Sequence, residues 1–291
     1  MSTFLQYVLS GLSIGAIYSL VALGFYIMWS ACRSVNFAHG DVMMVGAVLA
    51  VVSNDFGLSP YIGIPLSIVA CVLYGVLVER FAVRPYTKEA NAIGWMLTTI
   101  AIGIMVESFV TIKFGSFARA LPSPGVDKPI TIFGAGIYLQ EMLIPLFVIL
   151  FMIGLEVFYR RTMLGRAMRA VAFNRIAAGM MGINVGMVTS FSFALAAGLG
   201  GIAGILIGPI IQVSSTMGVL IGLKGFAVAI MASITSARGV VITGLLYGVL
   251  EKFVEGYISS AAREVVGFSI MILVLLMFPQ GLFGRKELTK V

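Results

Sequence analysis

The chain has 291 residues, of which 60% are hydrophobic and only 11% are charged, and its mean hydropathy is +1.07. Soluble domains are about half apolar and a quarter charged, so this composition argues against a water-soluble enzyme and indicates lipid as the main solvent. The 19 Lys and Arg residues exceed the 12 Asp and Glu residues, and we expect the excess in cytoplasmic loops rather than in a nucleic-acid-binding surface. Cys32 and Cys71 offer neither a disulfide framework nor a metal-binding spacing.

The first apolar run extends from Phe4 to Ala31, and no Lys or Arg precedes Arg33. A cleaved signal peptide has a basic start and a much shorter apolar core. A run of this length spans the roughly 30 Å hydrocarbon layer as a helix. We therefore expect it to be the first transmembrane helix.

Further apolar runs follow at about residues 41–53, 61–78, 92–112, 142–159, 185–210, 218–236, 239–258 and 265–278. Their lengths predict an all-α, polytopic membrane protein with about eight transmembrane helices plus a short or broken second helix. Whether residues 36–53 cross the membrane or re-enter it is left open by the pattern. No soluble domain stands out, so residues 1–291 are expected to form a single all-helical membrane domain.

Basic residues cluster in three places, which should all face the cytoplasm. The clusters are Arg80, Arg84 and Lys88; Arg160, Arg161, Arg166, Arg169 and Arg175; and Arg285, Lys286 and Lys290. This assignment places four spans between the second cluster and a cytoplasmic C-terminus. It makes residues 113–141 the longest external loop.

Small residues recur at every fourth position in one span, at Ala196, Gly200, Gly204 and Gly208. Such a ridge lets another helix approach closely, so we expect helix packing there. Pro209 is expected to end or kink the helix.

Residues 160–183 form a basic segment that is longer and more helix-prone than a simple tether requires. Arg166 and Arg169 share one helix face, and Gly182 belongs to a surface of small residues that a partner cleft could accept. We interpret the segment as a helix that docks on a partner. The alternative is that its arginines only fix the topology. The chain contains no P-loop motif, so ATP energy would have to come from another subunit.

The segment from Asn36 to Asp41 contains the single histidine, His39, between two apolar runs. Asn36 is a good N-cap for a helix that ends near Ser53, about 25 Å long and slightly short for a full crossing. A helix that begins inside the membrane directs its positive dipole end into the protein, where an anionic group could be received. The alternative is that His39 and Asp41 are interfacial residues satisfied by caps and water.

Two charges, Glu107 and Lys224, are embedded in predicted spans, where a lone charge costs roughly 2.5 to 3.5 kcal/mol on insertion scales. They should face a cavity or a partner, although Glu107 could instead snorkel towards the external loop. Glu251, Lys252 and Glu255 are interpreted as one solvated helix face on which the two glutamates repel.

With these segments assembled, nearly the whole chain resembles the permease subunits of bacterial branched-chain amino acid ABC importers, especially the LivH type. The most specific strings are Asn36-Phe37-Ala38-His39-Gly40 and Pro279-Gln280-Gly281-Leu282-Phe283-Gly284-Arg285. Shorter strings are Gly165-Arg166-Ala167-Met168-Arg169-Ala170, Gly182-Ile183-Asn184 and Lys224-Gly225-Phe226. After the last string, Ala232 to Ser236 stands where such permeases usually carry a glycine-rich turn, so the side chains there are expected to narrow the passage or to change its polarity.

The resemblance implies a multi-pass subunit of the bacterial inner membrane that works by alternating access and has no enzymatic activity. The implied partners are a second permease subunit (a copy or a LivM-like paralogue), two cytoplasmic ATPases that bind ATP and Mg²⁺, and a periplasmic binding protein. The expected substrate path includes Asn36, Phe37, His39, Gly40, Lys224 and Ser233. The expected ATPase-coupling residues are Gly165, Arg166, Arg169, Asn174, Arg175 and Gly182.

Three alternatives stay open. The same type of importer could carry urea, a short amide or an aromatic carboxylate. An ion-coupled secondary carrier would need buried carboxylates or histidines, of which Glu107 is the main candidate. An intramembrane enzyme ranks last, because the sequence offers no paired carboxylates, metal-ligand cluster or nucleophile with a base.

Overall fold

The structure is a computed structural model that describes residues 2–86, 94–115, 117–126, 128–132 and 134–284. The predicted cytoplasmic charges Lys88, Arg285, Lys286 and Lys290 lie outside the described residues. Five helices of the described part are long and apolar enough to cross a membrane. The all-α, polytopic membrane class predicted from the apolar runs is therefore confirmed.

The elements before the basic segment are α1 Ser2–Cys32, α2 His39–Asp55, α3 Pro60–Val78 with the π-helical turn Glu79–Val83, α4 Gly94–Phe114, the 3₁₀ turn Pro124–Val126, β1 Ile130–Ile132, β2 Ala135–Ile137 and α5 Leu139–Arg161. Within the basic segment and after it, the elements are α6 Met163–Phe173, α7 Arg175–Met180, α8 Val185–Ile211, α9 Met217–Met231, α10 Ala237–Tyr257 and α11 Ala262–Met277. The two strands pair antiparallel as a short hairpin within the predicted external loop.

Polar side chains fix where several helices begin after a turn. Thr162 accepts a hydrogen bond from the backbone N–H of Gly165 at 2.9 Å and so caps α6. Asn184 caps α8 in the same way through Met187 at 3.0 Å. These side chains satisfy backbone donors that the first helical turn leaves unpaired, so the apolar run after each cap starts at a defined residue.

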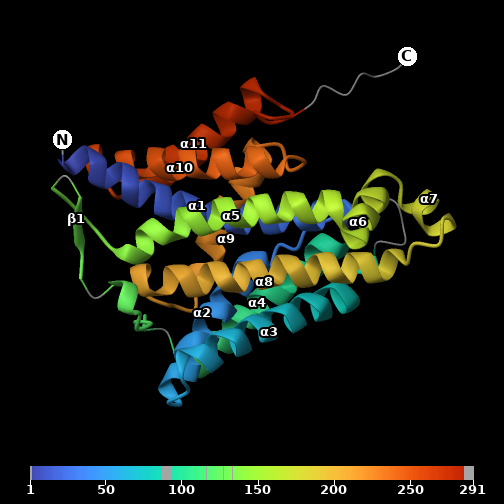
Figure 1. Ribbon diagram of the computed structural model, residues 1–291, viewed down its shortest axis with the longest axis horizontal. Coiled ribbons are helices and arrows are strands. Elements are labelled where there is room, and N and C mark those ends of the chain that lie inside the picture. Colours follow the sequence, from blue (N-terminus) through green and yellow to red (C-terminus); the bar gives the residue numbers. More distant parts are fainter. Residues whose placement is uncertain (1, 87–93, 116, 127, 133, 285–291) are drawn as a thin grey trace.

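The long helices run side by side between two ends of the molecule (Figure 1). We call the end that carries β1 and β2 the hairpin end, and the end that carries α6 and α7 the basic end. The first turns of α1 lie at the hairpin end, where the ring of Tyr7 packs edge-on against Tyr257 at 5.4 Å. Asp55 at the end of α2 pairs with Arg119 of the external loop at 3.2 Å. The last residues of α1 and the first of α8 lie at the basic end.

The helix α2 begins in the interior rather than at the basic end. His39 contacts Gly24, which lies eight residues before the end of α1, or about 12 Å along that helix. The chain returns from Cys32 through an extended stretch, and α2 then continues to the hairpin end. Residues 39–55 thus run as a helix from the interior to the hairpin end.

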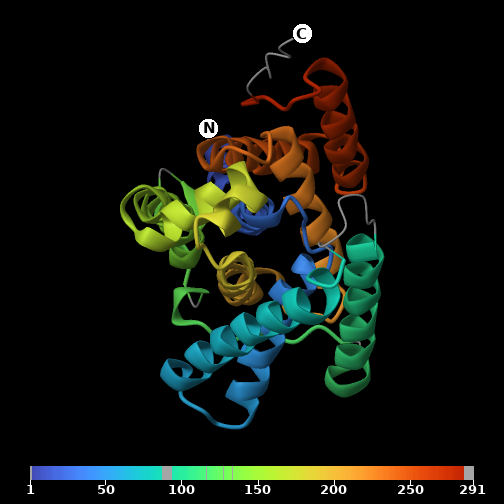
Figure 2. The same cartoon turned by 90° about the vertical axis from the view of Figure 1, so that its right-hand side faces the viewer.

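The helix α9 departs from the expected full span at residues 218–236. It has only 15 residues and ends at Met231, and Figures 1 and 2 show it running across the direction of the long helices. Glycines permit this crossing: a Cβ on Gly222 would lie 2.7 Å from the Cα of Gly40 at the start of α2. The turn after α9 returns to the basic end before α10 begins. Periodicity along the chain cannot distinguish a transverse helix from a spanning one, because both are buried in apolar surroundings.

Candidate functional site

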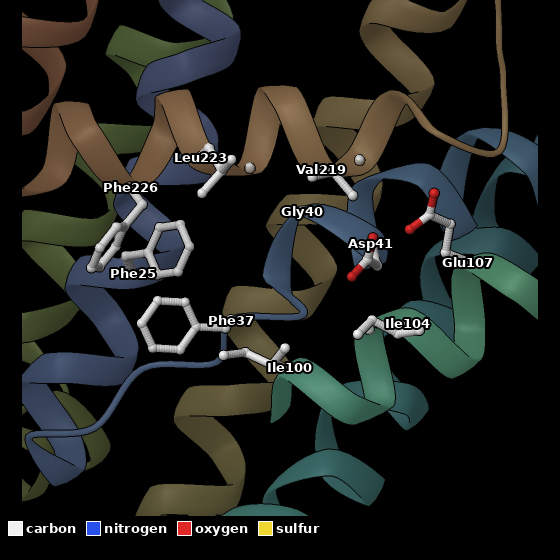
Figure 3. Close-up of a pocket in the computed structure, with 13 residues that line it drawn as sticks. Phe25, Phe37, Gly40, Asp41, Ile100, Ile104, Glu107, Val219, Leu223 and Phe226 are labelled. Atoms are coloured by element: carbon white, nitrogen blue, oxygen red, sulfur yellow. The ribbon is translucent and has the colours of Figure 1, made fainter. Parts of the chain in front are cut away.

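A cavity of about 250 Å³ lies where α2 and α9 begin, between α1 and α4 (Figure 3). Three phenylalanines form one side of it: Phe226 lies edge-on to Phe25 at 5.2 Å and to Phe37 at 5.3 Å between ring centroids. Ile100, Ile104, Val219 and Leu223 add further apolar surface. Ile104 and Leu223 are also 60% and 46% exposed, so the cavity opens to the surface between α4 and α9.

Two carboxylates, Asp41 and Glu107, line the other side of this apolar cavity (Figure 3). Asp41 is only 6% exposed, and its Oδ1 has no hydrogen-bond partner among the described residues. It stands in the first turn of α2, where the positive end of the helix dipole stabilises an anion. Gly103 of α4 allows the close approach, since a Cβ there would lie 2.5 Å from Asp41 Oδ2. The cavity therefore carries negative charge inside an apolar wall.

Of the four residues near α2 that were predicted for the substrate path, two line the cavity and two lie behind its wall. Phe37 and Gly40 line the cavity. The Asn36 side chain instead accepts the N–H of Ala38 at 3.0 Å, so it holds the turn that precedes α2. His39 is buried against Phe25, with the ring centroids 5.0 Å apart, and its Nε2 has no partner among the described residues.

Lys224 points away from this cavity into a buried network of charges. Its Nζ pairs with Glu251 and, at 2.8 Å, with Glu264, while the hydroxyl of Tyr18 donates to Glu251 at 2.6 Å. Arg263 completes the network by pairing with Glu264 at 3.1 Å. The interpretation of Glu251 as part of a solvated face is wrong, because this side chain is 4% exposed and is neutralised by Lys224 from another helix.

Ser233, the last residue predicted for the path, lies in a separate pocket of about 540 Å³ at the basic end. Arg33, Thr235, Ser236 and Gln280 also line this pocket. The Ser233 and Thr235 hydroxyls lie 3.0 Å apart. Ser233 has a φ of +69°, a conformation that costs little for glycine and more for serine. The segment without the glycine-rich turn therefore lines a polar pocket next to the end of α1.

The predicted docking segment 160–183 is not one helix. Residues 160 and 161 end α5, and α6 and α7 follow as two short helices separated at Asn174. Asn174 has φ −152°, outside the helical range, and its side chain accepts the N–H groups of Ile176 and Ala177 at 3.1 and 3.0 Å. An Asn at this position both ends α6 and caps α7, because its side chain competes for backbone donors.

The other predicted coupling residues lie on or beside these two helices. Gly165 lets α6 fold back on α5, since a Cβ would lie 2.6 Å from the Cα of Tyr159. Arg166 is exposed, and Arg169 lines a pocket with Glu156 and Arg238. Arg175 lies beside Cys32 at the end of α1, and Gly182 turns the chain towards α8 with φ +82°. Large apolar side chains are exposed around them, namely Met163, Phe173, Ile176, Met180 and Met181.

The small residues of α8 face α2 at the level of the cavity. A Cβ on Gly200 would lie 3.2 Å from the ring of His39, and a Cβ on Gly204 would collide with the backbone oxygen of Met43. A Cβ on Gly208 would meet Val213 and Leu121. Pro209 does not end the helix, which continues to Ile211. The proline is tolerated two residues before the helix end, where little of the hydrogen-bond ladder follows it.

These features can now be set beside known proteins. A family model described as branched-chain amino acid transport system / permease component matches residues 7–275. The chain belongs to this family. Membership confirms the resemblance found in the sequence, and it makes the chain a membrane permease component of a transport system rather than an enzyme.

Several members of the family match over nearly the full chain. The high-affinity branched-chain amino acid transport system permease protein LivH of Escherichia coli strain K12 is 33% identical, and the match covers 99% of this chain and 98% of LivH. The permease protein BraD of Pseudomonas aeruginosa is 31% identical with the same coverage. The probable permease LivH of Methanocaldococcus jannaschii is 29% identical over 91% of this chain and 88% of its own.

Among solved structures, PsaBC from Streptococcus pneumoniae in complex with Fab has the same fold. The TM-score is 0.54 at 13% sequence identity, and the match covers 96% of this chain and 93% of the other. At this identity the likeness concerns the fold alone.

The sequence did not predict the pairing of Asp41 with Glu107 across one cavity, or the part that Phe25 and Phe226 play in its wall. A signal was present, because both acids interrupt apolar runs. The expectation that Glu107 faces a cavity is confirmed, but the sequence treated Glu107 and Asp41 separately. Only the position of α4 against the start of α2 brings the two carboxylates together.

Proposed function

We propose that the chain is the membrane-spanning permease subunit of an ATP-driven ABC importer of the bacterial inner membrane, with branched-chain or other hydrophobic amino acids as solutes. The observation that carries this proposal is the end-to-end match to LivH and BraD, both named as high-affinity branched-chain amino acid permeases. An interior cavity with a largely apolar wall agrees with a small solute that has an apolar side chain.

The solute passes the cavity at the start of α2 by alternating access. The opening between α4 and α9 is covered by a second permease subunit, a copy or a LivM-like paralogue, so that the path lies between the two subunits. Exposed apolar side chains on both sides of the opening support this arrangement: Leu97, Ile104 and Met105 on α4, and Val219, Leu220 and Leu223 on α9.

Two cytoplasmic ATPases dock on α6 and α7, and they bind the ATP and Mg²⁺. The exposed apolar side chains of these helices, such as Phe173 at 93% and Met181 at 83% exposure, favour a protein partner over water. The sequence has no P-loop through which the chain itself would bind ATP. Movement of the ATPases reaches the cavity through α5 and α8, which flank the two docking helices in the chain.

The basic end faces the cytoplasm, which places the C-terminus inside and the hairpin end in the periplasm. The positive-inside rule supports this orientation, since the Arg-rich helices α6 and α7, together with Arg33, Arg80 and Arg84, gather at that end. A periplasmic binding protein then delivers the solute at the hairpin end.

Transport by reconstituted vesicles tests the proposal. We expect accumulation of leucine, isoleucine or valine only when the second permease, both ATPases and the binding protein are present and ATP is supplied on the ATPase side. Urea, a short amide and benzoate serve as competing solutes. Accumulation by this chain alone, or uptake of urea or benzoate in preference to all three amino acids, would refute the proposal.

A further inference from the structure

We propose that Asp41 and Glu107 bind the ammonium group of the transported amino acid within the cavity, while Phe25, Phe37 and Phe226 contact its aliphatic side chain. This inference rests on the proposed function and assigns its solute contacts. In this inference the cavity binds the ammonium end of the solute specifically, in addition to letting the solute pass.

The first argument is uncompensated charge. The thirteen residues that line the cavity include the two acids and, among these described residues, no Lys, Arg or His. Elsewhere in the described interior, buried acids are neutralised: Glu251 pairs with Lys224, and Glu79 accepts Arg84 Nε and Nη2 at 3.0 Å. Burying a carboxylate without a partner is costly, so a cavity that keeps one is expected to receive a cation.

The second argument is the state of Asp41 itself. Its side chain is more than nine-tenths buried, it faces the cavity, and its Oδ1 makes no hydrogen bond within the described residues. An acceptor held in place without a donor fits an incoming N–H group, and a bond between an ammonium and a carboxylate is among the stronger hydrogen bonds.

The third argument is the chemistry of the remaining wall. A Ca²⁺ or Mg²⁺ ion needs six or more oxygen ligands, counting water, whereas this wall beyond the two acids is built from aromatic, aliphatic and glycine residues. Three phenylalanine rings next to an acid pair suit an ammonium group that carries an aliphatic chain, because ring faces attract cations and ring edges pack on methyl groups. The cavity thus suits both the ammonium group and the aliphatic side chain of a branched-chain amino acid. Urea and benzoate have neither of these two groups.

A binding measurement on the purified complex of both permeases and both ATPases tests this site. The binding protein is omitted, because its own pocket would mask the membrane site. Tritiated leucine is displaced either with isoamylamine, which keeps the amino group and lacks the carboxylate, or with isocaproate, which keeps the carboxylate and lacks the amino group. We expect isoamylamine to displace leucine and isocaproate to fail on the wild-type complex, so this part requires no variant.

Variants then identify the side chains. Asp41→Asn and Glu107→Gln should each weaken leucine binding about tenfold or more, because each removes a charge-assisted hydrogen bond. Asp55→Asn is the matched control, since Asp55 lies on the same helix but is exposed at the hairpin end outside the cavity. It should bind leucine as the wild type does. Assembly of each variant is checked by gel filtration.

Three results would overturn the inference: no saturable leucine binding to the wild-type complex, displacement by isocaproate as strong as by isoamylamine, or wild-type affinity in both cavity variants. The proposed function is tested separately by ATP-dependent uptake of leucine by the wild-type complex with its binding protein. Uptake together with unaffected cavity variants removes only the ammonium site, whereas absence of uptake of any of the three amino acids removes the proposed function itself.

Discussion

Gly204 lets α8 pack closely against α2, because it has no side chain, and this packing fixes the position of α2 at the cavity. It lies where α8 meets the backbone of α2, with no room for a Cβ next to the Met43 oxygen. Close packing of this kind is a main source of helix association in membranes, where burial of apolar surface gives little driving force. The start of α2, with Gly40 and Asp41, is held against α8 by this contact.

We therefore expect Gly204→Val to destabilise the fold by about 3 kcal/mol, since overpacking forces the two helices apart. The midpoint of thermal inactivation in detergent measures the effect. Gly154→Val in α5 is the control, because a Cβ there would meet no heavy atom within 4 Å. Equal midpoints for the two variants would show that the contact between α8 and α2 does not stabilise the protein.

Lys224 is a second residue whose effect depends on its neighbours. Replacing it with Met leaves Glu251 buried with the Tyr18 hydroxyl as a donor and with only Arg263, at 3.4 Å, as a cationic partner. We expect Lys224→Met to cost about 3–5 kcal/mol of folding free energy, the usual effect of breaking a buried ion pair from one side. The fraction of protein that stays monodisperse after heating reports the loss.

Two further variants separate charge from packing at this network. Lys252→Met removes a more exposed lysine that pairs with Glu255, and it should have little effect. Adding Glu251→Gln to Lys224→Met should recover part of the lost stability, because it removes the buried charge that has lost its lysine partner. A single Lys224→Met variant as stable as Lys252→Met would contradict this account.

At the scale of elements, the break between α6 and α7 at Asn174 determines how these two helices are oriented at the basic end. Asn174 ends one helix and caps the next, so the exposed apolar side chains of the two helices stand on two short, separately oriented segments. A continuous helix over residues 160–183, as the sequence predicted, would present them in one line. The surface that we propose for ATPase docking therefore depends on the Asn174 side chain.

Asn174→Ala removes two capping hydrogen bonds and should weaken α7 by about 1 kcal/mol. We expect less amino acid transported per ATP hydrolysed, with assembly unchanged. Asn174→Asp should restore the ratio, since Asp is an equally good N-cap. The ratio is measured from uptake and phosphate release in the same vesicles, and a normal ratio in the Ala variant would exclude a coupling role for the cap.

At the scale of the whole molecule, Arg160, Arg166, Arg169 and Arg175 lie at the basic end, which should therefore face a different compartment from the hairpin end. A cysteine at Ser59, near the hairpin end, should react with an impermeant maleimide in intact cells once Cys32 and Cys71 are replaced by Ser. A cysteine at Gly179 in α7 should react only in inverted vesicles, prepared from cells without the two ATPases so that the proposed docking surface is free. Both positions are exposed at their respective ends, so burial does not limit labelling. The opposite pattern would reverse the proposed orientation.

The sequence by itself determined the class of this protein. Long apolar runs must form helices in lipid because every backbone N–H and C=O has to be satisfied within the segment, and clusters of arginine indicate which connections share a side. Motif strings such as that from Asn36 to Gly40 then pointed to the permease family, which the family match confirmed.

Only the tertiary structure decided how charges are paired and which helices span. Lys224 and Glu251 are 27 residues apart, and Asp41 and Glu107 lie on helices that are not neighbours in the chain. Whether a lone charge in an apolar run is neutralised or left facing a cavity depends on what the crossing helices bring opposite it. Local periodicity carries no such information, which is also why the transverse course of α9 and the paired acids of the cavity appear only in three dimensions.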